Sequence, residues 1–218
     1  MAGADSGFFA VGRTTFIKAC GLGLNPACAL LVMACGSGKD NVTTKWSAEA
    51  VGRYAGVRWT TAKDAIQALC DAGLVTNGGK PARPSYKLGK EGELIWLPRA
   101  VVEGVGNEVA PVMKLRQTQD VMALRLFVEL SSGQNLREDG GISTKIIYRH
   151  YERNMAGQQG AYTVWEFTRS TGYVKWATDI TKPHRREQFT KEEREAGSNA
   201  GVDFFRRLDW IESLGLIE

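Results

Sequence analysis

The chain has 218 residues, of which 43% are apolar and 24% charged, and its formal net charge is +4. This length and composition suit one large core or two ordinary ones and exclude a disordered chain. The four cysteines form no CxxC pair and the two histidines lie far from them in sequence, so we expect no metal, no cofactor and reduced thiols in a cytoplasmic protein. No stretch approaches the roughly 20 apolar residues of a membrane span, and the first residues do not have the pattern of a secretory signal.

The positive charge is concentrated in the first half of the chain. Residues 1–100 hold 12 lysines and arginines against 7 aspartates and glutamates, whereas residues 101–218 hold 16 against 17. A surface that faces phosphates needs such a local excess, because displaced counterions supply much of the affinity for DNA. An ordinary solvated face would also carry it, so charge alone leaves both interpretations open.

Two apolar segments and a helix come first. Residues 8–11 and 14–22 are expected to form a strand or an arm across the first domain. Pro26 at the first helical position opens a helix, and residues 27–34 are apolar almost all round. This composition predicts a buried helix.

The next segment has the pattern of two helices joined by a tight turn. Ser47 is a good N-cap for a helix over 48–54 that ends at Gly56. Thr60 or Thr61 is expected to cap a second helix, which Gly73 stops. The second helix has an apolar face with residues three and four positions apart, namely Ala62, Ala65, Ile66 and Leu69.

A hairpin follows. Residues 74–76 and 85–88 are expected to be extended, and Asn77-Gly78-Gly79 between them supplies the positive φ angles of a tight turn. The order helix, turn, helix and basic hairpin resembles the winged helix-turn-helix family. The resemblance is carried by Ala50-Val51, Gly56-Val57, the run from Thr61 to Ile66, Leu69, and the exit from Ala72 to Val75.

The resemblance implies a sequence-specific binder of double-stranded DNA. In the family, the second helix of the motif enters the major groove and the wing contacts the flanking backbone. Here the reading helix would run from Thr60 to Ala72 and the wing over 76–87. The base-reading residues would be Arg58, Trp59, Thr60, Thr61, Lys63, Asp64 and Gln67. The backbone contacts would come from Lys45, Lys80, Arg83, Ser85 and Lys87.

Two tryptophans lie near this motif, and one of them, Trp59, has competing interpretations. An aromatic residue at the start of an exposed helix packs on a neighbouring helix, stacks on a sugar or meets a partner protein, and packing is the commonest of the three. We therefore expect Trp59 to pack on a neighbour. Trp46 is assigned to the core beside the helix over 48–54.

The second half is predicted to repeat the first. Residues 99–117 are poor in large periodic apolar side chains and are expected to link a domain over 1–98 to one over 118–218. The second domain opens with an amphipathic helix over 118–131. Two segments match the first motif, 142–151 with 46–54 and 200–217 with 61–75, and an insertion over 154–198 holds a predicted hairpin with strands 161–169 and 172–177. The expected fold is mainly α with small β-hairpins (α+β), as two tandem winged helix-turn-helix domains.

Three functions follow from this interpretation. The first is a transcription regulator of the kind carried by mobile elements, phages or plasmids. The second is a replication initiator, because the paired layout also resembles the initiators of plasmids and phages. The third is a protein-interaction module that binds a host complex, which the near-neutral second half and the aromatic residues Trp59 and Trp176 favour. Double-stranded DNA is the expected partner, with a homodimer and a host or mobile-element protein left open. No nucleophile with a nearby base and no paired carboxylates emerge, so we expect no enzyme.

Overall fold

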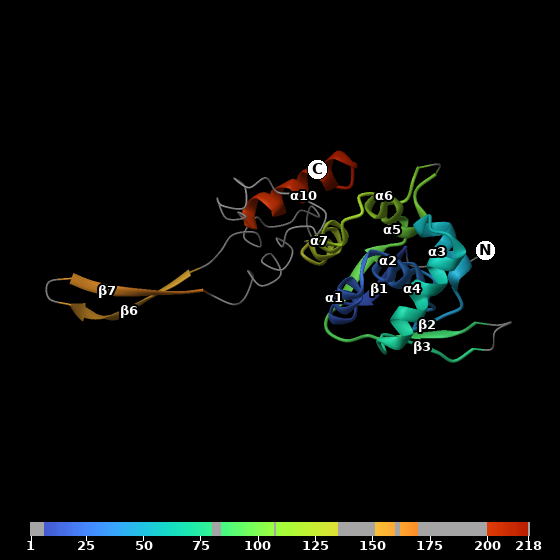
Figure 1. The fold of residues 1–218 in the computed structure, drawn as a ribbon, viewed down its shortest axis with the longest axis horizontal. Helices are drawn as coiled ribbons and strands as arrows, with labels where there is room; N and C mark the ends of the chain where they lie inside the picture. Colours follow the sequence, from blue (N-terminus) through green and yellow to red (C-terminus); the bar gives the residue numbers. More distant parts are fainter. Residues whose placement is uncertain are drawn as a thin grey trace. The chain divides into compact units, whose positions relative to one another are not determined.

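The computed structural model describes residues 7–79, 84–106, 108–134, 151–159, 162–169 and 200–217. Helices and small antiparallel sheets alternate along the chain, so the expected α+β class is confirmed (Figure 1). The chain divides into two compact units, one made of Met1–Ser132 with Arg207–Glu218 and the other of Gly133–Arg206. The first unit contains the helices and strands within residues 8–132.

The N-terminal segment forms a strand and a helix. Strand β1 (Phe8–Gly12) pairs antiparallel with β5 (Leu94–Pro98), and Phe9 lies opposite Leu97 in this register. Because side chains alternate across a strand, one face of the pair is buried, while Phe8 and Trp96 on the other face are 45% and 47% exposed. Helix α1 (Arg13–Leu22) follows β1 directly.

Helix α2 (Leu24–Cys35) is the centre of the first unit. Every residue from Ala27 to Cys35 is buried, as the all-round apolar pattern predicted. The helix contacts α1, α3 and α4 and also β1 (Figure 1). Burial of each large aliphatic side chain contributes about 1.5–3 kcal/mol, so this helix organises the core.

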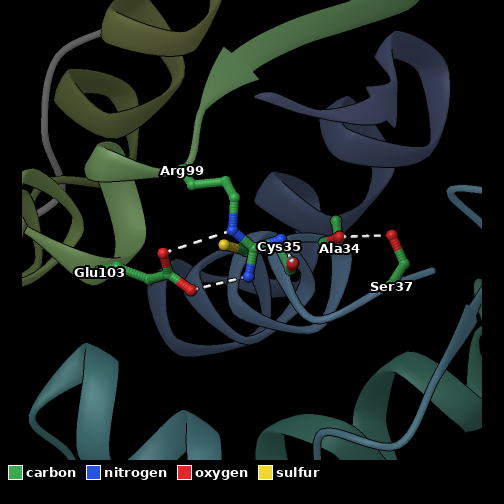
Figure 2. A network of polar contacts seen from close by, with 5 residues as sticks. All are labelled: Ala34, Cys35, Ser37, Arg99 and Glu103. Carbon is green, nitrogen blue, oxygen red and sulfur yellow. Dashed lines mark hydrogen bonds and ion pairs between the residues drawn. The ribbon is translucent and has the colours of Figure 1, made fainter. Parts of the chain in front are cut away.

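An arginine caps the C-terminal end of α2. The Arg99 guanidinium donates Nη1 to the carbonyl oxygen of Cys35 at 2.9 Å, and its Nη2 pairs with Glu103 Oε1 at 2.7 Å. Ser37 Oγ donates to the Ala34 oxygen at 2.6 Å (Figure 2). The last carbonyls of a helix have no partner within the helix, and a cation there is stabilising, so these contacts fasten the segment after β5 to α2.

The two helices expected on either side of a tight turn are present. Helix α3 (Ala48–Ala55) has Ser47 at its N-cap position and ends at Gly56, which has φ +65°. Helix α4 (Trp59–Asp71) starts earlier than expected, because Arg58 occupies the N-cap position and both Thr60 and Thr61 lie inside the helix. A three-stranded antiparallel sheet is formed by β2 (Thr43–Thr44), which precedes α3, and by β3 (Val75–Asn77) and β4 (Tyr86–Leu88), which follow α4; the strand order is β2-β4-β3.

The predicted linker over 99–117 is structured. It contains helices α5 (Ala100–Glu103) and α6 (Pro111–Gln117). Small apolar residues of these helices are buried, and α6 contacts α2, α3 and α5. Helix α7 (Val121–Ser132) packs on β5 and α1, where buried Glu129 accepts from Arg13 Nη2 at 2.7 Å. The helix expected to open a second domain therefore belongs to the first unit.

The C-terminal helix α10 (Ala200–Ser213) brings the end of the chain back to α6 and α7. Its Arg207 pairs with Asp120, and Lys114 Nζ donates to the oxygen of Leu214 at 3.0 Å. The second unit contains a hairpin of β6 (Tyr151–Gln159) and β7 (Tyr162–Arg169). Strand 161–169 was expected, but its partner precedes it in the chain, whereas the expected partner at 172–177 lies outside the described residues, as does most of segment 142–151.

Candidate functional site

The outer face of α4 is polar and exposed. Ala62, Ala65, Ile66 and Leu69 are buried against the core, as the spacing predicted. The opposite face exposes residues that the sequence assigned to base reading. These are Trp59, Thr60, Lys63, Asp64 and Gln67, with Arg58 exposed just before the helix and Thr61 half-buried.

Two side-chain contacts organise this face. Lys63 Nζ lies 5.5 Å from the centroid of the Trp59 ring, a cation–π distance. One turn further along, Gln67 Nε2 donates to Asp71 Oδ1 at 2.7 Å. The amide of Gln67 is therefore already engaged, and a base contact through it would have to replace the bond to Asp71.

Trp59 does not pack in the core. Its side chain is 59% exposed, more than the side chains of Phe8, Trp96 or Trp210. The expectation of packing was wrong for a geometric reason. Trp59 is the first residue of α4, and the buried stripe begins only at Ala62, so the ring lies beside that stripe.

The sheet next to α4 presents a polar row to solvent. Lys87 at the centre of β4 lies opposite Thr43 on one side and Thr76 on the other, and all three are exposed. The opposite face of the sheet is buried through Val75, Leu88 and Thr44. Lys87 and the exposed Lys45 beside β2 are thus at the surface, whereas Lys80 and Arg83 lie outside the described residues.

Two hydrogen bonds stabilise the described part of the β3–β4 hairpin near its turn. Gly78 N donates to the oxygen of Ser85 at 2.8 Å, and Gly79 N donates to Asn77 Oδ1 at 3.0 Å. The half-buried Ser85 therefore contributes its backbone to strand pairing. An Asn side chain that accepts from a backbone amide two residues on is a common stabiliser of turns.

A shallow hollow lies beside α3. Trp46 stacks on Tyr54 with ring centroids 4.8 Å apart, and Arg53 Cζ lies 5.3 Å from the Tyr54 centroid. The hollow has a volume of about 260 Å³ and is lined by Lys45, Trp46, Ser47, Glu49, Ala50, Arg53 and Tyr54. Trp46 was assigned to the core, but it is half-buried and borders this hollow. Sequence periodicity gave no signal for the stacked pair, because Trp46 lies before α3, outside the helical repeat to which Tyr54 belongs.

The exposed charges around this surface have mixed signs. Lys45, Arg53, Arg58, Lys63 and Lys87 face solvent, and so do Glu49, Asp64 and Asp71. Cations are in excess, as the charge distribution along the chain predicted. The acidic residues on α4 restrict that excess to the start of the helix and to the sheet.

The cysteines are placed as core residues. All four thiols are free, and Cys20, Cys28 and Cys35 are buried. Burial raises the pKa of both Cys28 and Cys35 to about 12, so these thiols are protonated at neutral pH and poor metal ligands. Within the described ranges, no group of three or more His, Cys, Asp or Glu side chains could hold a metal ion.

Comparison of the chain with protein-family models, with curated proteins and with solved structures gave no match. Among the described helices, none combines the length and the apolar character needed to cross a membrane. Assignment of a function therefore depends on the geometry of the surface formed by α4 and its sheet.

Proposed function

We propose that the first unit is a winged helix-turn-helix module that binds double-stranded DNA, with α4 in the major groove and the β3–β4 hairpin on the backbone. One observation carries the proposal. A 13-residue helix buries one face in the core and exposes a polar face that begins with Arg58, Trp59 and Thr60, beside a sheet whose solvent face centres on Lys87.

The order of elements supports the module. Helix α2, strand β2, helices α3 and α4, and strands β3 and β4 follow one another, and the strand order is β2-β4-β3. At 1.5 Å per residue α4 is about 20 Å long. The diameter of an α-helix with its side chains is about 10–12 Å, which matches the roughly 12 Å width of the major groove. The N-terminal residues of such a helix reach base edges, which assigns base contact to Arg58, Trp59, Thr60 and Lys63.

Backbone contacts are assigned to the lysines around the helix. Lys87 on β4 and Lys45 beside β2 are exposed and are suited to contact phosphates. Phosphate contacts set the register of a protein on DNA, whereas base contacts select the site. The module would serve a transcription regulator, and a replication initiator would use the same contacts.

The tandem arrangement is a further part of the proposal. It is supported by one shared feature, the way in which α4 and α10 end. Gly73 N donates to Cys70 O and Leu74 N to Leu69 O, and the same pattern recurs from Gly215 N to Glu212 O and from Leu216 N to Ile211 O. Both ends are Schellman caps with a glycine at positive φ, as expected for copies of one sequence pattern.

The experiment is selection of DNA by the purified chain. A pool of random short duplexes is incubated with the chain at low salt, and the retained DNA is sequenced. We expect retention and an enriched motif, and a palindromic motif would add a dimer. A chain that retains no duplex at low salt would refute the proposal.

A protein-interaction module is the second candidate. Trp59, Trp96 and Trp210 are exposed, and Asp64 and Asp71 share the outer face of α4 with its cations. If Lys63→Ala and Lys87→Ala leave DNA retention unchanged while Trp59→Ala abolishes the association with a protein partner, this candidate replaces the first.

A further inference from the structure

The first turn of α4 exposes a large apolar surface at the place where the proposed function puts base edges. We propose that Trp59 contacts the 5-methyl groups of thymines and makes the module selective for thymine at defined positions of its site. This inference rests on the proposed function. The ligand is thus a duplex with methylated pyrimidine edges in the major groove.

The fold itself does not use the Trp59 ring. The side chain is 59% exposed, and the buried stripe of α4 consists of Ala62, Ala65, Ile66 and Leu69. Trp46 provides a contrast, because its ring stacks on Tyr54 and occupies the space beside Gly36. Trp59 can therefore give its surface to a ligand at little cost to the core.

Lys63 restrains the ring and supplies charge beside it. Its ammonium nitrogen lies 5.5 Å from the Trp59 centroid, one turn along the same helix. A ring that is already held on the outer face loses less conformational freedom on binding. The adjacent ammonium is placed to meet a phosphate or a base oxygen, so the pair combines an apolar contact with an ionic one.

The chemistry of tryptophan indicates which feature of DNA it reads. An indole has one N–H donor and no acceptor, so it cannot make the bidentate contacts by which Arg reads guanine or Gln reads adenine. Its large surface is suited to the thymine methyl, the apolar feature that distinguishes thymine in the major groove. Burial of one methyl group corresponds to about a fourfold change in affinity.

The test uses the duplex that the wild-type chain selects from a random pool. Each thymine in that duplex is replaced singly by deoxyuridine, which removes only the 5-methyl group. Binding is then measured for the wild type, Trp59→Ala, Trp59→Phe and Trp96→Ala. Trp96 is the matched control, because it is an exposed tryptophan on β5, outside the surface formed by α4 and its sheet. Urea unfolding of each variant checks that it is folded.

We expect at least one thymine whose replacement weakens wild-type binding about fourfold and leaves the affinity of Trp59→Ala unchanged. Trp59→Phe should keep part of the effect, and Trp96→Ala should behave as the wild type. Retention of DNA without a deoxyuridine effect, or an effect that Trp59→Ala preserves, would overturn the inference and leave the proposed function standing. Failure of the wild type to retain any duplex would refute the proposed function itself, and this inference with it.

Discussion

Arg207 on α10 and Asp120 ahead of α7 form an ion pair, with Nε 2.6 Å from Oδ2 and with both side chains at most 1% exposed. The same carboxylate accepts from the backbone N–H of Met122 at 2.8 Å, so it also caps α7. One aspartate therefore joins two parts of the chain that are 87 residues apart.

Replacement of Asp120 by Asn tests how much this ion pair contributes to the free energy of unfolding. The amide can still cap α7, but the Arg207 guanidinium loses its buried carboxylate, so the free energy of unfolding should fall by about 3–5 kcal/mol. Urea denaturation measures the change. Lys18→Ala is the control, since it breaks an exposed pair with Glu91 and should cost less than about 1 kcal/mol. An equal effect of the two substitutions would contradict the role given to the buried pair.

Gly36 is required by the ring of Trp46. A Cβ at position 36 would lie 2.1 Å from Trp46 Cδ2, so Gly36→Ala must displace the indole from its stack on Tyr54. We expect a destabilisation of about 1–3 kcal/mol, as for overpacking, and a change in the near-ultraviolet circular dichroism. Gly21→Ala in α1 is the matched control. A Cβ there meets nothing within 4 Å, so that variant should be neutral or slightly more stable. An unchanged aromatic spectrum in Gly36→Ala would contradict the placement of Trp46.

Asp40 should titrate at unusually low pH. The backbone N–H groups of Val42 and Thr43 donate to its carboxylate and hold its pKa at about 2, below the ordinary value of 3.8. Because the folded pKa is the lower one, ionised Asp40 contributes stability above pH 3.8, and this contribution is lost as the pH falls towards 2. Carboxyl-carbon NMR should give a midpoint near 2, and the unfolding free energy of Asp40→Asn should approach that of the wild type at acid pH. A midpoint near 3.8 would show that these hydrogen bonds are absent in solution.

Thiol labelling tests the burial of the cysteines. Cys70 is half-buried, whereas the other three are buried, and burial raises the pKa of all four thiols. A thiol reagent at neutral pH should therefore label Cys70 slowly and first, and Cys70→Ser should remove that phase. Labelling of all four at one rate would indicate that α1 and α2 are not packed as described.

Local signals in the sequence predicted the elements of the motif. Gly56 and Gly73 both have positive φ and stop helices where expected, and the three-four spacing from Ala62 to Leu69 identified the buried face of α4. These features could be predicted from the sequence because each depends only on residues within one or two helical turns.

The features that were missed depend on distant contacts. Val101, Val102 and Val112 lack helical periodicity over a long window, yet they are buried because α5 and α6 pack on α2 and α3. The partner of strand 162–169 was misplaced because alternation identifies a strand but not its neighbour. In the candidate site, Lys63, Gln67 and Lys87 were correctly expected at the surface, but the Trp59–Lys63 and Trp46–Tyr54 contacts follow only from the structure.

The salt dependence of duplex binding, measured for the wild type and three single-lysine variants, distinguishes a surface that contacts phosphates from an ordinary solvated surface. Lys45→Ala and Lys87→Ala each remove one exposed cation that is assigned to a phosphate contact, and Lys18→Ala removes an exposed cation of α1. We predict that each of the first two lowers the affinity and makes the slope of log affinity against log salt shallower by about 0.9, while Lys18→Ala leaves the slope unchanged. Equal slopes for all four proteins, or no salt-dependent binding at all, would contradict the assignment of α4 and its sheet to DNA.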